Sequence, residues 1–258
     1  MLESKETRIR RHCKTLRLPS VVAALSETLA LAQQETWTLE DSLLYLLEAE
    51  IEGRQERRIA RLMRQAHLPP GKTLDAFDQS RLTPRLRQMI PRLRDGDFIN
   101  RAENVLVFGL PGTGKTHFTA ALAGEWIQNN HSVLFTPAYK LIDGLLRAKR
   151  DHELARELRR LDRFEVVILD DIGYIQQSQA EMEVLFTFFA ERYERRSIVI
   201  TSNLVFSAWD KIFKDPLTTA AAIDRVVHHS HIVEFGPEIP SMRAEVAQRR
   251  QRSTQQQE

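Results

Sequence analysis

VLVFGLPGTGKT, residues 105–116, joins a short apolar run to a glycine-rich segment, and a helical pattern follows at residues 117–127. The segment matches GxxxxGK(S/T) between a strand and a helix, which is the context of a phosphate-binding P-loop. Glycines allow the tight turn and leave backbone amides open to phosphate oxygens, and the helix N-terminus adds partial positive charge. The predicted nucleotide-binding residues are Gly109, Leu110, Pro111, Gly112, Thr113, Gly114, Lys115 and Thr116.

Two acids at the end of a second apolar run extend this site. Lys115 is placed to reach the outer phosphates, and the Thr116 hydroxyl is placed to bind Mg²⁺. In EVVILDD, residues 165–171, four consecutive apolar residues predict a central parallel strand whose carboxyl end lies beside the P-loop. We assign Asp170 to the magnesium ion and Asp171 to polarising the attacking water. The alternative is that the two acids cap the next helix.

A third apolar run, SIVITSN at residues 197–203, also ends in a polar residue. Asn203 could hold the attacking water or the terminal phosphate. An Asn after a strand is otherwise a common turn residue, because its side chain bonds to nearby backbone. Its order after the acidic strand favours the functional interpretation.

The chain beyond residue 104 predicts an α/β fold. Short β-branched runs alternate with longer amphipathic stretches, which is typical of a parallel five-stranded sheet covered by helices on both faces. The five predicted strands are residues 105–108, 132–135, 165–169, 197–201 and 231–235.

The amino-terminal residues predict a small all-helical domain, residues 1–66, for partner or DNA interaction. Apolar residues recur every three or four positions over residues 43–66, and Thr38 with Asp41 resembles a helix cap. Pro69, Pro70 and Gly71 interrupt the pattern. We therefore predict a linker at 67–72, an ATPase domain at 73–240 and a polar tail at 241–258.

Composition excludes several classes of protein. The chain has 258 residues, of which 42% are hydrophobic and 28% charged, and 37 basic less 35 acidic residues leave a net charge of +2. These values exclude collagen-like and wholly disordered chains. The single cysteine, Cys13, excludes a disulfide framework or a Cys-rich zinc site and favours a reducing compartment. No run resembles a signal peptide or a membrane span, so we expect a cytoplasmic protein with no membrane partner.

Charge is unevenly distributed along the chain. Residues 54–94 contain eleven Arg and Lys against three acids, an excess of 11 − 3 = +8. Such a stretch permits nucleic acid as a partner, and it equally fits a solvated helix face with surface ion pairs.

The P-loop, the acidic strand and the strand ending in Asn203 together resemble the AAA+ ATPases. The resemblance implies ATP, Mg²⁺ and assembly of identical subunits, and it makes Asn203 the first sensor. It also implies an arginine that completes the site of a neighbouring subunit, for which Arg225 in AAAIDRVVHHS is the best match. A surface ion pair of Arg225 with Asp224 or Glu234 is the alternative.

The resemblance narrows to the IstB family of insertion-sequence transposition helpers, which are near relatives of the DnaC helicase loaders. It is carried by LRLPSVVAAL, AEIEGRQERRIARLMRQAHLP, TLDAFD, FINRAENVLVFGLPGTGKTH, VVILDDIGY, ITSNL and IDRVVHHS. It implies a factor of the bacterial cytosol or nucleoid that oligomerises on double-stranded DNA with ATP and recruits a transposase. It also points to a DNA-contacting helix at 138–151, whose cations are Lys140, Arg147, Lys149 and Arg150. For any one of these residues, a solvated basic face is the alternative.

Two departures from the broader AAA+ pattern affect the expected mechanism. Asp171 stands where glutamate is usual, so hydrolysis is expected to be slow and regulatory. Residues 236–258 are too few for the usual helical lid, although Arg243 in PSMR could contact the nucleotide as a second sensor.

Two other functions remain open from the sequence. One is a DnaC-like replicative helicase loader, against which the amino-terminal resemblance argues. The other is a P-loop small-molecule kinase, which leaves Asn203 and Arg225 without roles. The sequence also leaves the residues of the adenine pocket unassigned, because Leu74, Phe77 and Phe98 could line that pocket or belong to the core.

Overall fold

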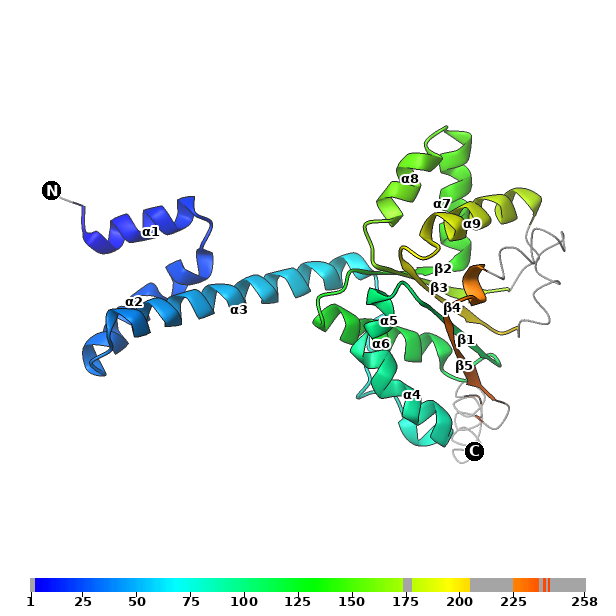
Figure 1. Ribbon diagram of the computed structural model, residues 1–258, viewed down its shortest axis with the longest axis horizontal. Coiled ribbons are helices and arrows are strands. Elements are labelled where there is room, and N and C mark those ends of the chain that lie inside the picture. The colour runs from blue at the N-terminus through cyan, green and yellow to red at the C-terminus, as the bar shows by residue number, and fades with distance from the viewer. Residues whose placement is uncertain (1–2, 174–177, 205–224, 237–238, 240, 242–258) are drawn as a thin grey trace, which may run out of the picture. The chain divides into compact units, whose positions relative to one another are not determined.

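The computed structural model describes residues 3–173, 178–204, 225–236, 239 and 241. It divides into two compact units, Met1–Arg61 and Leu62–Glu258 (Figure 1). Arg243 and the predicted tail beyond residue 241 lie outside the described residues, as does Asp224. Among the helices that are described, none combines the length and the apolar character needed to cross a membrane.

Helices form the first unit. They are α1 (Lys5–Thr15), α2 (Pro19–Gln34) and the amino-terminal part of α3 (Leu39–Ala66). Thr38 and Asp41 cap α3 reciprocally, since Asp41 N donates to Thr38 Oγ1 at 3.1 Å and Thr38 N donates to Asp41 Oδ2 at 2.9 Å. The cap expected from the sequence is thus present.

A buried carboxylate joins α2 to α3 within this unit. Glu50 is only 4% exposed and accepts hydrogen bonds from the amides of Ser20 and Val21. Burial alone would raise the pKa of Glu50, but hydrogen bonds from Arg54 and these amides hold that pKa below its ordinary value. Arg54 and Arg57 both pair with Glu50, so part of the basic stretch serves the fold.

A parallel five-stranded sheet lies at the centre of the second unit, in the order β2-β3-β4-β1-β5. The predicted strands are confirmed, and no bound differs by more than three residues. The strands are β1 (Asn104–Gly109), β2 (Val133–Pro137), β3 (Val166–Ile172), β4 (Ser197–Ser202) and β5 (Ser230–Phe235). Because the strands are parallel, the carboxyl ends of β1, β3 and β4 meet at one edge, where ligands bind in such sheets.

Helices cover both faces of the sheet (Figure 1). On one face lie α7 (Ala138–Arg150), α8 (Leu154–Leu161) and α9 (Gln179–Arg192). On the other lie α4 (Pro84–Asp95), α5 (Asp97–Asn100) and α6 (Lys115–Gln128), and the 3₁₀ turn η1 (Gln79–Arg81) precedes α4. Phe98 packs edge-on against Trp126 at 5.1 Å and is 2% exposed, so it belongs to the core.

A buried arginine fixes the amino-terminal edge of the sheet. Arg192 is 2% exposed, and burial lowers its pKa to about 9. Its guanidinium donates to four backbone carbonyls, those of Leu161, Phe164, Glu165 and Ser197. These bonds tie the end of α8 to the residues that lead into β3 and to the start of β4.

Candidate nucleotide-binding site

The P-loop connects the end of β1 to the start of α6. Gly109, Gly112 and Gly114 have φ angles of 156°, 83° and 105°, which side chains rarely tolerate. A Cβ atom on Gly109 would lie 2.6 Å from the Cβ of Phe235 on β5. Gly114 is the N-cap of α6 and no side chain caps this helix, so its first amides are open to an anion.

Five of the eight predicted P-loop residues line a cavity of about 350 Å³. They are Pro111, Gly112, Gly114, Lys115 and Thr116. The other three shape the loop: Lys115 Nζ donates to the carbonyls of Gly109 and Leu110 at 2.7 and 2.9 Å, and Thr113 Oγ1 donates to Leu110 O at 2.9 Å. The ammonium group is therefore held at the mouth of the loop, where phosphate oxygens would meet it.

An irregularity in the sheet brings both acids of β3 into this cavity. Successive strand residues normally face opposite sides of a sheet. Here Leu169 is in register with Ile200 and Ile172 with Ser202, so Asp170 and Asp171 together oppose one residue of β4. Asp171 adopts a left-handed φ of 65°, which Asp tolerates better than most residues. Both carboxylates consequently line the cavity with Asn203.

Thr201 on β4 holds this irregular segment in place. Its hydroxyl donates to Asp170 Oδ1 and accepts from Asp171 N, each at 2.7 Å. The side chain is 1% exposed. Sequence reasoning assigned Thr201 only to the strand; a polar residue near the end of an apolar run was the available signal.

Burial raises the pKa of the Asp170 carboxyl, although hydrogen bonds from Thr201 and Thr116 act against this shift. A divalent cation would offset the cost of ionising this buried group. The Thr116 hydroxyl and the Asp170 carboxylate supply the hard oxygen ligands that Mg²⁺ prefers. The residues present therefore fit the predicted ion.

Asn203 contributes a buried acceptor. Its Oδ1 atom has no hydrogen-bond partner among the described residues, although such atoms are nearly always paired in folded proteins. Because Asn203 also lines the cavity, a water or phosphate-bound group there would satisfy it. This favours the functional interpretation of Asn203 over that of a turn residue.

Two cavity residues, one before α4 and one in α6, were not identified from the sequence. Lys72 and His117 both line the cavity. His117 Nε2 lies 3.0 Å from Thr73 O, and burial lowers the pKa of its imidazole. The Phe77 ring packs 5.2 Å from His117, and it would meet a Cβ on Gly114 at 3.3 Å. Phe77, one of the three candidates for the adenine pocket, thus lies against the P-loop.

Arg225 is exposed and lies away from this cavity. It lines a separate hollow over α9 with Gln179, Met182 and Glu183. No ion pair between Arg225 and Glu234 is present in the described part of the chain. Arg225 is therefore not among the residues that line the cavity at its own P-loop.

The four predicted DNA-contacting cations do not share one face of α7. Lys140, Arg147 and Arg150 are exposed and recur at helical spacing, with Asp143 between them. Lys149 instead pairs with Glu183 of α9 at 2.6 Å. The structure thus separates an exposed stripe of three cations from one ion-paired lysine.

Comparison with known proteins gives a family match over most of the chain. The family model described as IstB-like ATP binding protein matches residues 11–252. An insertion-sequence ATP-binding protein of Sinorhizobium fredii is 39% identical over 92% of this chain and 80% of its own length. The corresponding protein of insertion sequence IS5376 from Geobacillus stearothermophilus is 35% identical over 87% of this chain and 90% of its own length.

Solved structures of low sequence identity share the fold of the second unit. DnaI aligns with a TM-score of 0.55 and 20% identity over 66% of this chain and 95% of its own. DnaA from Aquifex aeolicus, bound to AMPPCP, gives 0.52 and 19% over 66% of this chain and 51% of its own. The DnaC helicase loader gives 0.50 and 17% over 65% and 98%. The fold is therefore that of the P-loop AAA+ proteins.

Proposed function

This chain belongs to the IstB-like ATP-binding protein family, and from that premise we propose that it is an ATP-dependent assembly factor for insertion-sequence transposition. As an AAA+ member of an ATP-binding family, the chain is an ATPase. In the proposal it oligomerises on double-stranded DNA when ATP is bound and recruits the transposase of the same element. Hydrolysis then releases or resets the complex.

The observation that carries the proposal is the cavity at the carboxyl edge of the sheet. Open amides at the start of α6 and the Lys115 ammonium would bind the phosphates, while Thr116 and Asp170 would hold Mg²⁺. When bound, the ion neutralises charge developing on the phosphates. Asp171 and Asn203 are placed to orient a water, because both face the same cavity.

Assembly follows from the position of Arg225. An arginine supplied from outside the nucleotide site can stabilise transition-state charge in phosphoryl transfer. In the proposal Arg225, which is exposed over α9 and does not line its own cavity, acts in this way on a neighbouring subunit. The site is therefore complete only between subunits, so ATP binding and self-association are coupled.

DNA contact is proposed for the exposed stripe of α7, Lys140, Arg147 and Arg150. Arginine and lysine on one helix face bind phosphates without reading sequence, so affinity should fall steeply with salt, by about 0.9 logarithmic units per contact for each decade. Lys149 is omitted, because its ion pair with Glu183 would have to be broken first. The basic segment at 54–94 is the competing surface.

The proposal is tested by measuring the mass distribution of the full chain with duplex DNA. Samples without nucleotide, with ADP and with a non-hydrolysable ATP analogue are compared. DNA-bound oligomers that form only with the analogue support the assembly factor. Monomers under every condition contradict it and favour the kinase or a loader that needs its helicase.

Two matched variants assign the DNA surface. The first replaces Lys140, Arg147 and Arg150 with alanine, and the second replaces three exposed arginines of α4, Arg85, Arg87 and Arg92. We expect the α7 variant to lose DNA binding and its salt dependence, and the α4 variant to retain them. The reverse result would assign DNA binding to the basic segment at 54–94 instead of α7.

A further inference from the structure

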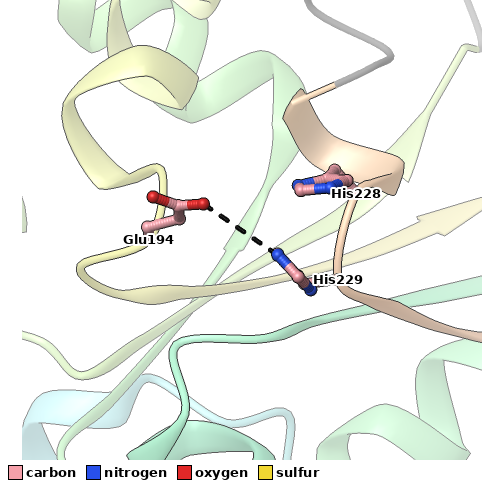
Figure 2. Close-up of side chains that lie close together, drawn as sticks. All are labelled: Glu194, His228 and His229. Atoms are coloured by element: carbon pink, nitrogen blue, oxygen red, sulfur yellow. Dashed lines mark ion pairs between the residues drawn. The ribbon is translucent and has the colours of Figure 1, made fainter.

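A group of metal-ligating side chains lies outside the nucleotide site. Glu194, in the turn after α9, lies beside His228 and His229, in the turn before β5 (Figure 2). One ligand atom from each residue falls within 4.8 Å of the others, and all three residues are exposed. His228 and His229 lie within IDRVVHHS, in which only Arg225 was given a role from the sequence.

The distance between the Glu194 carboxylate and the His229 imidazole suits two ligands of one metal ion better than a direct hydrogen bond between them. His229 Nε2 faces Glu194 Oε1 at 4.0 Å, beyond the usual length of an N–H···O hydrogen bond (Figure 2). In tetrahedral zinc sites, bonds of about 2.0–2.1 Å place ligand atoms about 3.3 Å apart. Small rotations of these exposed side chains would close the difference, and solvent would fill the remaining position.

The imidazole of His228 is oriented by a neighbour. The Tyr193 hydroxyl lies 3.0 Å from His228 Nδ1, and the two rings stack at 6.3 Å. Metal-binding histidines commonly have one ring nitrogen held in this way, which fixes the ring for coordination through the other. The His228 and His229 rings also lie 3.9 Å apart, so both can serve one centre.

Buried hydrogen bonds fix the two backbone segments that carry these ligands. Asn104, at the start of β1, donates from Nδ2 to Val226 O at 3.0 Å and from its amide to His229 O at 2.9 Å. Asn104 Oδ1 accepts from Ile198 N of β4 at 2.9 Å. The Glu194 side is held by Arg192, whose carbonyl accepts from the amides of Arg195 and Arg196.

The neighbouring cation does not compete for Glu194. Arg195 directs its guanidinium to Asp162 at 3.0 Å and to Glu191 at 3.6 Å. The Glu194 carboxylate therefore faces two imidazoles rather than a guanidinium (Figure 2). Two nitrogen donors and one oxygen donor select zinc-like transition ions over Mg²⁺.

We propose that Glu194, His228 and His229 form a binding site for a zinc-class divalent transition metal, with water as the fourth ligand. The ion joins the end of α9 to the turn before β5. Arg225 lies three residues before His228 on that turn, so the ion restrains the segment that presents this arginine. The site itself does not depend on nucleotide.

The test is titration of chelator-treated full-length protein with Zn²⁺, followed by calorimetry in excess Mg²⁺. Co²⁺ replaces Zn²⁺ in a parallel experiment, since its visible absorption reports tetrahedral nitrogen ligands. We expect one ion per chain and a rise in the unfolding temperature. His228→Ala and Glu194→Gln should weaken binding by tenfold or more, and Tyr193→Phe by roughly tenfold.

Controls separate this site from adventitious binding and from misfolding. His12→Ala removes an exposed imidazole from α1 and should leave the affinity unchanged. His229→Asn keeps a residue that tolerates the left-handed φ of 59° at that position. Retained ATP binding shows that each variant is folded. Equal Zn²⁺ affinity in wild type, His229→Asn and Glu194→Gln, or no binding by the wild type, overturns the proposal.

Discussion

Replacing Thr201 with valine tests the link between β4 and the acids of β3. The substitution keeps the shape and the β-branching that a strand favours, but it removes the hydroxyl. Two 2.7 Å hydrogen bonds are lost, one to the Asp170 carboxylate and one from the Asp171 amide. A bond to a charged group contributes about 1.5–3 kcal/mol and a neutral one about 1 kcal/mol, so the expected loss of stability is about 2.5–4 kcal/mol.

The same change should weaken magnesium binding. The Thr201 hydroxyl lowers the pKa of Asp170 against the effect of burial, so its loss raises that pKa further. Because the ion binds the ionised carboxylate, half-maximal hydrolysis should require more Mg²⁺, and the requirement should ease as pH rises.

Thr119→Val is the matched control. Thr119 is also 1% exposed, but its hydroxyl donates only to helix carbonyls, those of Lys115 and Thr116. Thr119→Val should lower the free energy of unfolding, measured with urea, by less than about 1 kcal/mol, and it should leave the Mg²⁺ requirement unchanged. If the two variants match in stability and in Mg²⁺ dependence, Thr201 does not position the acids.

Four further substitutions address the nucleotide site. Lys115→Ala removes an ammonium group that lies 2.7 and 2.9 Å from two loop carbonyls. It should weaken ATP binding by roughly 100-fold or more. An unchanged ATP affinity in equilibrium binding measurements would refute the P-loop assignment. Asp171→Asn retains a residue suited to its left-handed φ of 65° and should keep ATP binding while losing steady-state hydrolysis; undiminished turnover places catalysis elsewhere. Arg225→Ala should lose hydrolysis and assembly but keep ATP binding by the monomer. If this variant forms oligomers of normal mass and releases phosphate at the normal rate, Arg225 does not complete a neighbouring site. Asp170→Asn should raise the unfolding free energy of the nucleotide-free protein at neutral pH. Because burial raises the folded pKa of Asp170 above its unfolded value, the wild type loses stability as pH rises between the two values, so the difference should shrink in acid; a pH-independent difference contradicts this.

The sequence predicted those features that a contiguous segment encodes. The P-loop is one such feature, since strand, glycines and helix start lie within residues 105–116. The five strands were predicted because each is a short apolar run. The order of the strands across the sheet follows from packing between distant segments and was not predicted.

Features that depend on register or on distant partners were not predicted. The sequence assigned both Asp170 and Asp171 to the site, but the irregular pairing of β3 with β4 that brings both into one cavity was not predicted. Arg192 looked like one of several charged residues at a helix end, yet it is buried against four carbonyls. Asn104 likewise gains its role only when β4 and the turn before β5 lie beside it.

Strain and unpaired polarity are concentrated where the nucleotide is proposed to bind. Asp171 has a left-handed backbone, Asp170 is buried with a raised pKa, and the amide oxygen of Asn203 has no partner among the described residues. A cation would offset the cost of ionising Asp170, and a bound water or other hydrogen-bond donor would satisfy the Asn203 oxygen. A ligand that satisfies these groups would stabilise the carboxyl ends of β3 and β4 together, which is the physical link that the proposed coupling of ATP binding to assembly requires.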